Sequence, residues 1–442
     1  MNYDVIVIGG GMAGYTSAIH CLEQGLKTAL VNNGRSALHF SSGSVDLLSS
    51  TPSGIPVRFP YPAIASFPLE YPEHPYAKIG QERVSGAVDW FTEMMNRAGV
   101  LLNQTENNEN HQRITTLGTL KSTFLSQQFV EQIGFNQSQN SFDRIVLVAI
   151  ESFRDFQTQV VADNLLSTPM FNRTPIVQLP VDVTNHLNGA GSINNYRSTD
   201  FAKLFNNETC FNDFANQITA GATERDLVIL PSIFGALQGV ELLQKLKART
   251  GLNFHEVATM PPSLMGIRLE ETLERHFVKL GGVQLKGDSV VRGEFSQSEH
   301  GFQLEKVWTR NLRDYALTAD AFVLASGSFF SNGLQAQRNR IIEPVFGLEV
   351  CNTGPRADWH SDAFFSPSSH EFISFGVETN RHFRPRMTNG TVENLYCCGS
   401  ILAHYNPILE GSGGGVAIAT AHAVSSQIIY NNNQAKLEEA VC

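Results

Sequence analysis

The stretch DVIVIGGGMAGYTSAIHCLEQGLKTALVNNG, residues 4–34, decides the fold prediction for this chain. Its apolar run at 4–8 predicts a buried strand, and 12–24 has the pattern of a helix that ends at Gly25. A second apolar run at 27–32 predicts another strand. These elements together form one β-α-β unit, with a cluster of glycines at its first turn.

The glycines of this turn are spaced as G-x-G-x-x-G. In nucleotide-binding β-α-β units the first glycine allows the tight turn, the second lets the backbone approach a phosphate, and the third lets helix and strand pack closely. The N-terminus of the following helix adds free N–H groups and a positive dipole. The alternative is a glycine turn that only packs. We predict a phosphate-binding turn made of Gly9, Gly10, Gly11, Met12, Ala13 and Gly14.

The end of the second strand departs from the dinucleotide pattern. An acidic residue about 20 residues past the glycines usually binds the ribose hydroxyls, whereas Asn32 stands 18 residues past Gly14. An amide can still hydrogen-bond a sugar, but without the strength that charge gives a carboxylate. No arginine at 32 or 33 indicates a 2′-phosphate, although Arg35 is close. An intact phosphate turn with a weakened ribose site favours FMN over FAD or NAD, with FAD as the alternative.

Two later segments indicate a flavin site. The C-terminal run NLYCCGSILAHYNPILEGSGGGVAIATAHAVSSQI, 394–428, predicts a strand, a loop, and a glycine run that opens a helix of small residues. A helix N-terminus aimed at a flavin ring would stabilise the negative charge that builds near N1 and O2 on reduction; the alternative is a helix packed tightly on the sheet. AFVLASGSFF, 321–330, predicts a buried strand with a small-residue turn. The predicted cofactor residues here are Ser326, Gly327, Gly399, Ser400, Gly413, Gly414, Gly415 and Val416.

The order of the elements predicts an α/β protein. We expect a Rossmann-like flavoprotein domain of the FAD/NAD(P)-binding type at 1–104 and 276–442, with a second α/β (α+β) domain inserted at about 105–275. Within the first domain, the Ser-, Gly- and Pro-rich stretch 41–76 is expected to be a loop. The segment 283–325 alternates as short strands of a meander would.

Composition excludes several classes of function. The chain has 442 residues and a net charge of −10, which argues against a nucleic-acid surface. No apolar run approaches the roughly 20 residues needed to span a bilayer, so we expect a cytoplasmic chain without direct membrane insertion. The six cysteines include no C-x-x-C pair, which argues against an iron–sulfur or zinc site, and no metal site is predicted.

Several longer segments resemble one known family, the B subunit of anaerobic glycerol-3-phosphate dehydrogenase. They are GRSALHFSSGSVDLLS (34–49), TLGTLKST (116–123), MPPSLMGIRLEETLERHFVKLGG (260–282), LASGSFFSNGL (324–334) and EPVFGLEV (343–350). The resemblance implies a bacterial three-subunit complex that oxidises sn-glycerol 3-phosphate to dihydroxyacetone phosphate and passes electrons through flavins to a quinone. It also implies FMN in this subunit, FAD in the A subunit, and iron–sulfur clusters and the membrane contact in the C subunit. The chain would then lie on the cytoplasmic face of the bacterial inner membrane through its partners.

Hydride removal from a secondary alcohol needs a base for the hydroxyl proton, cationic groups for the phosphate, and a flavin within reach. We take His39 and His404 as candidate catalytic residues, the alternative for His39 being a hydrogen bond within its loop. Arg268 is the candidate for substrate, the alternative being an ion pair with Glu271 or Glu274. The loop after the second strand contributes further candidate cofactor residues, namely Arg35, Ser36, Ser42 and Gly43.

Three functions remain open at this stage. The first is an FMN-dependent redox subunit of the dehydrogenase, and the second a non-catalytic assembly or electron-relay subunit that keeps a flavin fold. The third is a free-standing FAD- or NAD(P)-linked oxidoreductase, against which the glycine-rich C-terminal helix start and Asn32 both count. Whether substrate is oxidised on this chain or on the A subunit also stays open.

Overall fold

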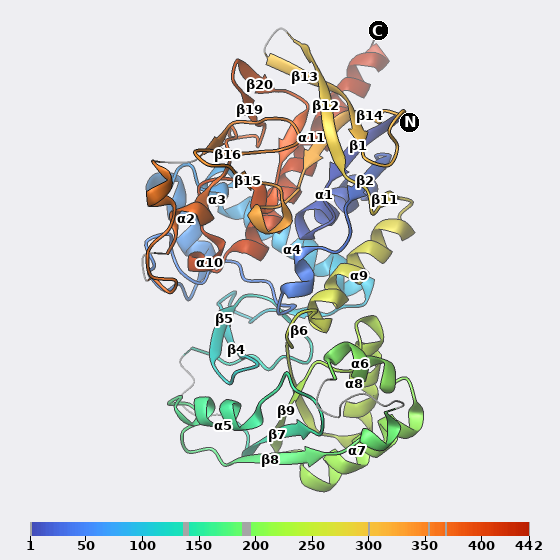
Figure 1. The fold of residues 1–442 in the computed structure, drawn as a ribbon, viewed down its shortest axis with the longest axis vertical. Helices are drawn as coiled ribbons and strands as arrows, with labels where there is room; N and C mark the ends of the chain where they lie inside the picture. Colours follow the sequence, from blue (N-terminus) through green and yellow to red (C-terminus); the bar gives the residue numbers. More distant parts are fainter. Residues whose placement is uncertain are drawn as a thin grey trace. The chain divides into compact units, whose positions relative to one another are not determined.

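The computed structural model describes residues 2–135, 141–187, 196–298, 301–351, 354–366 and 369–441. The chain divides into two compact units. The first comprises Met1–Ala37, Asp46–Ala98 and Leu273–Cys442, and the second comprises Leu38–Val45 and Gly99–Thr272. Each unit contains a parallel sheet of its own (Figure 1).

The first unit is built on a parallel five-stranded sheet with the order β11-β2-β1-β14-β21. Residues 5–8 of β1 are all buried, as expected for a parallel strand covered on both faces. Helix α1 joins β1 to β2, so the predicted β-α-β unit is confirmed. The bounds are β1 (Asn2–Ile8), α1 (Met12–Glu23), β2 (Thr28–Asn32), β11 (Val283–Lys286), β14 (Thr318–Leu324) and β21 (Leu395–Cys397).

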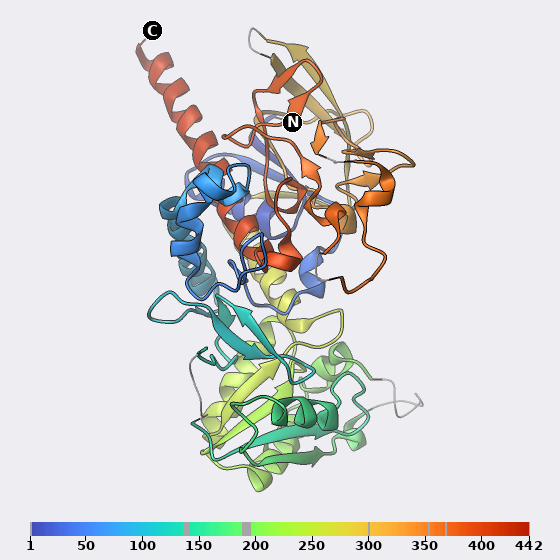
Figure 2. The same cartoon turned by 90° about the vertical axis from the view of Figure 1, so that its left-hand side faces the viewer.

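The long helix α11 (Gly413–Val441) packs against α1, α3 and α4. Figure 2 shows it running through the first unit to the C-terminus. The other helices of this unit are α2 (Pro60–Glu70), α3 (Pro75–Ile79), α4 (Gln81–Ala98) and α10 (Pro407–Glu410), with short 3-10 turns η3 (Phe329–Ser331), η4 (Arg356–Trp359), η5 (Glu371–Ser374) and η6 (Gly399–Ile401).

Helix α2 corrects the expectation of a loop over 41–76. Its sequence, PYPAIASFPLE, is rich in proline, but Pro60 stands in the first turn, where a helix needs no N–H. Ile64 and Phe67 of this helix are fully buried. Tertiary burial of these side chains therefore outweighs the low helix propensity of the segment.

The structure also differs from the meander predicted at 283–325. Its first and last strands, β11 and β14, join the parallel sheet, and only β12 and β13 pair as an antiparallel hairpin. That hairpin extends into a four-stranded sheet of β12 (Val290–Gln297), β13 (Gly301–Thr309), β20 (Gly390–Val392) and β19 (Arg386–Met387). Two small ladders complete the unit, β15 (Gln335–Ala336) with β16 (Ile341–Ile342) and β17 (Val350–Cys351) with β18 (Gly376–Val377).

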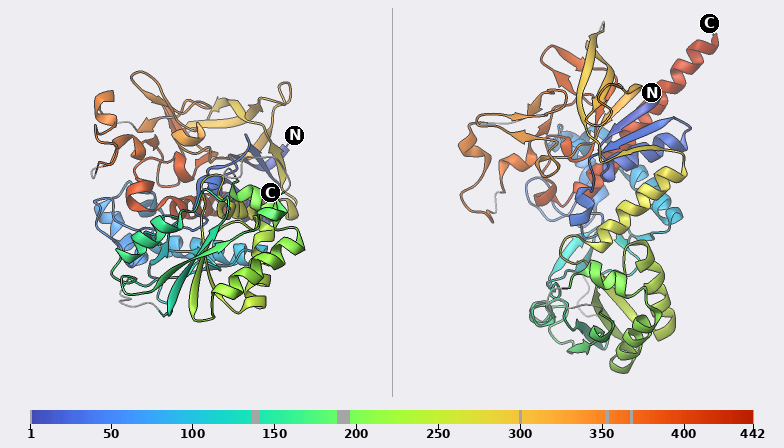
Figure 3. Two further views of the ribbon diagram at one scale, coloured as in Figure 1. Left: turned by 60° about the horizontal axis from the view of Figure 1, so that its bottom comes forward. Right: turned by 45° about the vertical axis from the view of Figure 1, so that its right-hand side comes forward.

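The second unit contains a parallel four-stranded sheet with the order β10-β9-β7-β8. Helices flank this sheet (Figure 3), and β9 is buried along its whole length. The strands are β7 (Arg144–Ile150), β8 (Ile176–Val181), β9 (Asp226–Pro231) and β10 (Asn253–Val257). The helices are α5 (Thr158–Leu166), η2 (Thr184–His186), α6 (Ser198–Leu204), α7 (Glu208–Gly221) and α8 (Leu237–Thr250).

Two short antiparallel ladders and two helical segments complete the chain. One ladder pairs β3 (Leu102–Asn103) with β6 (Ser126–Gln127), and the other is the hairpin of β4 (His111–Ile114) and β5 (Leu120–Thr123). The turn η1 (Ala37–Phe40) and the helix α9 (Leu264–Lys279) each contain residues of both units. Within the part of the chain that the structure describes, no helix has the length and hydrophobicity that crossing a bilayer requires.

Candidate functional site

The glycine turn after β1 combines two tightly packed glycines with one open glycine. Gly9 has a φ of +118°, and a Cβ there would lie 2.2 Å from the Ala325 carbonyl oxygen. A Cβ on Gly14 would lie 1.9 Å from the carbonyl oxygen of Gly9. A Cβ on Gly11, in contrast, would meet nothing within 4 Å. Packing therefore requires Gly9 and Gly14, whereas Gly11 leaves its backbone open to approach from outside.

The N-terminus of α1 has donors to offer at this open position. Gly11 is the N-cap residue, and no side chain caps the helix. The first N–H groups of a helix have no partner within it, and together with the helix dipole they favour an anion. The turn therefore has the geometry of a phosphate site.

Two other predicted segments lie beside this turn, because β1, β14 and β21 are neighbouring parallel strands whose carboxyl ends meet at one edge. The Ser326 hydroxyl is buried and has no hydrogen-bond partner among the described residues. Gly327 and Gly399 both have positive φ, and a Cβ on Gly399 would lie 2.7 Å from Cβ of Ala13. A Cβ on Gly327 would lie 3.6 Å from the Ser400 hydroxyl. The structure thus brings the predicted segments 9–14, 326–327 and 399–400 together.

Asn32 closes the loop that follows β2. Its amide donates to the Gly34 carbonyl at 2.9 Å, and its amide oxygen accepts from the Gln284 side chain at 3.3 Å. The side chain is 5% exposed and limits Gly10, where a Cβ would lie 2.7 Å from Cβ of Asn32. Both the nitrogen and the oxygen of the Asn32 side-chain amide are therefore hydrogen-bonded within the protein.

The cofactor residues predicted in the loop after β2 differ in exposure and in the unit to which they belong. Arg35 is exposed and Ser36 and Ser42 are half-buried. Gly43 is buried with a φ of +73°, and its carbonyl accepts from the Gln127 side chain at 3.0 Å. Ser42 and Gly43 belong to the second unit, and Arg35 and Ser36 to the first.

The glycine run that opens α11 packs closely within the first unit. A Cβ on Gly415 would lie 2.2 Å from the Tyr76 hydroxyl and 2.6 Å from Cδ1 of Leu47. Gly413 is less crowded, with Cβ of Pro407 at 3.2 Å, and Val416 is fully buried. The close-packing interpretation accounts for Gly415, and a flavin contact at Gly413 and Gly414 stays a prediction.

A cavity of about 400 Å³ in the first unit is lined by His74, His370, His404, Tyr405 and Glu410, among others. His74 Nε2 lies 3.0 Å from a carboxylate oxygen of Glu410, and both side chains are 1% exposed. Sequence reasoning missed His74, which stands 336 residues from its partner and in no motif.

The Glu410 carboxylate is bonded on both of its oxygens. Besides His74, it accepts from the Asn406 backbone N–H at 2.6 Å and from the Ser412 hydroxyl at 2.8 Å. Burial raises the pKa of Tyr405, and the Glu410 carboxylate raises it further. Glu410 therefore fixes the loop before α11 and shapes one wall of the cavity.

Both predicted catalytic histidines are bonded through Nε2 to a glutamate. His39 Nε2 lies 3.2 Å from Oε2 of Glu270, with the two side chains 10% and 9% exposed. His404 Nε2 lies 3.0 Å from both carboxylate oxygens of Glu378, and the His404 hydrogen bond holds the pKa of Glu378 below its usual range. A carboxylate on Nε2 leaves Nδ1 as the ring nitrogen that can take a proton.

Arg268 is enclosed in the second unit. Its guanidinium forms an ion pair with Glu256, with distances of 2.9 and 3.1 Å, and also donates to the Gln127 side chain at 2.7 Å. The carbonyls of Ala236 and Gly235 accept the remaining bonds. An ion pair is the predicted alternative for Arg268. Its acid is Glu256, where the sequence predicts Glu271 or Glu274. A substrate role for Arg268 stays a prediction that would require the guanidinium to leave these partners.

Comparison with known proteins gives the family. Residues 4–416 match the family described as FAD binding domain. The chain is 45% identical, over 99% of both chains, to the B subunit of the anaerobic glycerol-3-phosphate dehydrogenase of Vibrio vulnificus (strain YJ016). The protein of the same name from Actinobacillus pleuropneumoniae serotype 5b (strain L20) is 35% identical, over 97% of this chain and 99% of that one.

The chain belongs to the family of anaerobic glycerol-3-phosphate dehydrogenase B subunits, within the FAD-binding domain family. The resemblance drawn from the sequence segments is thereby confirmed, as is the α/β flavoprotein fold. Among solved structures, 3-ketosteroid Δ1-dehydrogenase from Sterolibacterium denitrificans matches with a TM-score of 0.44 and 11% identity, over 97% of this chain and all of that one. The family supports a flavin and names FAD, and it gives no support to FMN.

Proposed function

We propose that this chain is the flavin-carrying B subunit of an anaerobic glycerol-3-phosphate dehydrogenase. It would take part in oxidising sn-glycerol 3-phosphate to dihydroxyacetone phosphate, with electrons passed to the quinone pool. The observation that carries the proposal is the open Gly11 at the uncapped start of α1, in a chain similar over its full length to proteins of that name.

The flavin phosphate would bind at the turn 9–14, through the N–H groups of the first turn of α1. Ser326 would donate its hydroxyl, which lacks a partner among the described residues, and Gly327, Gly399 and Ser400 would line the same edge. When bound, the flavin supplies the hydride acceptor. These residues hold and orient it, and they leave the chemistry of the ring to the cofactor.

The proton of the substrate hydroxyl needs a base, and the His–Glu pairs offer two. In each pair the glutamate holds the ring by Nε2, which orients Nδ1 to accept a proton. His404 also lines the 400 Å³ cavity of the first unit. We propose His404 and His39 as the candidate bases, and oxidation on this chain rather than on a partner is part of the same proposal.

The proposal also distinguishes between two flavin nucleotides, FMN and FAD. Asn32 in place of an acid, with its amide engaged by Gly34 and Gln284, supports a weak ribose site and hence FMN. The family description supports FAD. FMN is therefore proposed from Asn32 alone, with FAD as the alternative.

Partners belong to the proposal as well. The relatives are each named as the B subunit of their dehydrogenase, which supports assembly with an A and a C subunit. The A subunit would carry FAD, and the C subunit would carry iron–sulfur clusters and attach the complex to the cytoplasmic face of the inner membrane.

One experiment tests the core of this proposal. The chain is purified with its partners and denatured, and the released flavin is identified by chromatography and counted per chain. Stoichiometric flavin supports the proposal, FMN or FAD decides the Asn32 argument, and a chain without flavin is a scaffold. Dye reduction by the isolated chain with glycerol 3-phosphate then shows whether substrate is oxidised here.

A further inference from the structure

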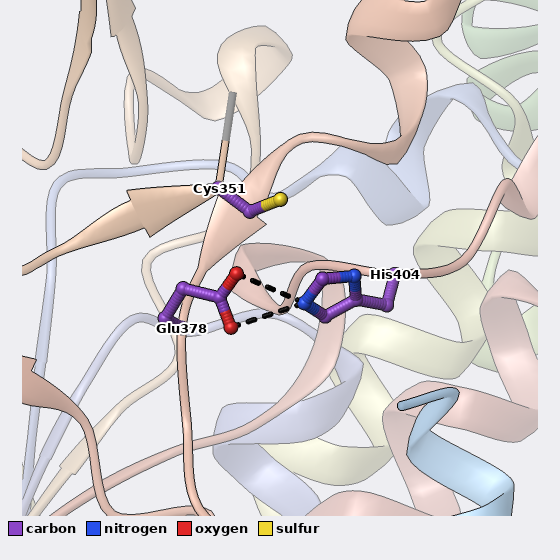
Figure 4. A group of neighbouring side chains, drawn as sticks. All are labelled: Cys351, Glu378 and His404. Atoms are coloured by element: carbon purple, nitrogen blue, oxygen red, sulfur yellow. Dashed lines mark hydrogen bonds and ion pairs between the residues drawn. The ribbon is translucent and has the colours of Figure 1, made fainter. Parts of the chain in front are cut away.

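The first unit contains a cluster of a cysteine, a glutamate and a histidine that the flavin proposal does not use as a group. One ligand atom from each of Cys351, Glu378 and His404 can be chosen so that all three lie within 4.8 Å of one another. Figure 4 shows the three side chains converging on one space, with both carboxylate oxygens of Glu378 directed at the His404 ring. We propose that Cys351, Glu378 and His404 bind one divalent transition-metal ion, of the class represented by Zn²⁺.

The backbone holds the three residues in place before any ion binds. Cys351 ends β17 and pairs with Gly376 of β18, and Glu378 follows that strand directly. The segment with His404 runs beside β18, since Val377 of that strand forms a parallel bridge with Leu402 and its carbonyl accepts from the Ala403 N–H at 3.4 Å. Three adjoining segments thus present the ligands, so little conformational freedom is lost on binding.

Two features show how closely these segments are fitted. A Cβ on Gly376 would lie 2.3 Å from the carbonyl carbon of Leu402, so only glycine lets the His404 segment approach β18. His404 itself has a φ of +70°, a region that costs a residue with a side chain about 1 kcal/mol or more. The fold holds His404 in this strained position, which places its ring against Glu378.

The donor set and its charge suit a zinc-like ion. Thiolate, imidazole and carboxylate are all zinc ligands, and three protein ligands with a fourth open position are common where water or substrate also binds. At bond lengths of about 2.0–2.3 Å, tetrahedral ligand atoms stand roughly 3.3–3.6 Å apart, so shifts of about 1 Å would suffice. The thiolate and the carboxylate together would balance the charge of the ion.

The cluster is also accessible. Cys21, Cys210, Cys397 and Cys398 are buried, and Cys351 is half-buried. The side chains of His404 and Glu378 are 27% and 31% exposed. Among the described cysteines, Cys351 is therefore the one that an ion from solvent can reach most directly.

The protonation states define a measurable signature. Burial, and then Glu378, raises the pKa of Cys351 to about 11, so the thiol is protonated near neutral pH in the absence of metal. Glu378 is ionised, since His404 and Cys351 both lower its pKa and Lys78 lowers it further. A metal ligand thiol must lose its proton. Binding should therefore release about one proton per ion, from Cys351.

The inference goes beyond the proposed function and changes one part of it. With a metal on Nε2, the neutral His404 ring carries its proton on Nδ1. His404 would then be a ligand rather than a base, and His39 would remain the candidate base. Loss of metal and loss of flavin or dehydrogenase activity are separate readouts, so either proposal can fail without the other.

The test titrates the full-length chain, stripped with a chelator, with Zn²⁺ by calorimetry in buffers of different ionisation enthalpy. We expect one ion per chain and about one proton released. Co²⁺ should give a thiolate-to-metal charge-transfer absorption. Cys351→Ser should abolish that absorption and weaken Zn²⁺ binding at least about tenfold, since even changes around a ligand cost 10–100-fold. Glu378→Gln and His404→Gln should weaken binding similarly.

His186→Ala is the matched control, because His186 Nε2 pairs with Asp213 at 2.6 Å in the second unit. This variant should bind Zn²⁺ as the unmodified chain does. Thermal melting of each metal-free variant separates a lost ligand from a lost fold. Failure of the unmodified chain to bind one Zn²⁺, or a cobalt thiolate band that survives in a folded Cys351→Ser chain, would overturn the proposal.

Discussion

The glycine turn at 9–14 of the first unit leaves hydrogen-bond donors unpaired, whereas the Arg268 centre of the second unit (Arg268, Glu256 and Gln127) pairs its donors within the protein. At the turn, the start of α1 has no capping side chain and the Ser326 hydroxyl has no partner among the described residues. At the centre, Arg268 donates to Glu256, Gln127 and two carbonyls. Buried polar groups are normally bonded within the protein. An unpaired hydroxyl beside an uncapped helix start is therefore available to a ligand, whereas the satisfied donors of Arg268 hold the structure together.

The largest expected effect is at the Arg268 centre. Arg268→Met would leave the Glu256 carboxylate, which is fully buried in the ion pair, without its cation. Losing one partner of a buried pair costs about 3–5 kcal/mol of unfolding free energy, measurable by denaturant titration. The double variant Arg268→Met/Glu256→Gln should recover part of this loss, because no buried charge remains unpaired. A single variant within about 1 kcal/mol of the unmodified chain would assign Arg268 to something other than structure.

The same substitution at two glycines sharpens the contrast within the turn. Gly9→Ala puts a methyl 2.2 Å from the Ala325 carbonyl oxygen at a φ of +118°, and should cost about 2–3 kcal/mol of stability. Gly11→Ala meets open space and should leave the stability of the flavin-free chain nearly unchanged. It should nevertheless weaken flavin retention by about tenfold or more, since a methyl intrudes where a phosphate approaches. Full flavin retention in Gly11→Ala would make the turn a packing feature only.

The sequence predicts the turn well because its signal is local. Strand, glycine spacing and helix stand within one stretch of 31 residues at 4–34, and parallel strands bring Ser326 and Gly399 to the same edge. The sequence does not predict helix α2, where burial of Ile64 and Phe67 outweighs proline.

Contacts between side chains far apart in the chain could not be predicted from the sequence either. His74 pairs with Glu410 across 336 residues. Cys351 comes near His404 because β17 pairs with β18 and Val377 of β18 bridges to Leu402. Likewise, the segment Leu38–Val45 follows the first strands along the chain, yet it clusters with the second unit. A Cβ on Gly266 would lie 1.8 Å from the Leu38 carbonyl oxygen, and that close approach is set by tertiary packing.

A further contrast to Arg268 is the pair of buried His20 and half-buried His422, whose rings stack with centroids 4.2 Å apart. Burial lowers the pKa of His20 to about 3, with His422 adding to it, and burial lowers that of His422 to about 4. These folded-state values lie below the unfolded value near 6.5. The stability from keeping the rings neutral is therefore present above pH 6.5 and is lost as the pH falls toward 4.

For His20 alone, the loss at pH 5 should be roughly 2 kcal/mol relative to neutral pH. Unfolding free energies measured from pH 7 to 5 should fall accordingly. His20→Asn keeps a polar group near Ser425, which His20 Nδ1 contacts at 2.7 Å, and should flatten the dependence. An unchanged slope in this variant would show that other groups cause the acid sensitivity.

The smallest effect tests the donor argument most directly. Ser326→Ala removes a hydroxyl whose oxygen is buried and without a partner among the described residues, so no hydrogen bond of the flavin-free chain is lost. Its stability should stay unchanged or rise by up to about 1 kcal/mol, because an unsatisfied buried group is removed. Flavin affinity should fall by about 3- to 10-fold, the equivalent of one hydrogen bond.

Thr272 gives the matched control, because its buried hydroxyl oxygen also has no partner among the described residues. Thr272→Val should leave flavin affinity unchanged. If both variants bind flavin equally well, an unpaired hydroxyl marks no ligand in this protein, and the contrast between the turn and the Arg268 centre rests on Gly11 alone.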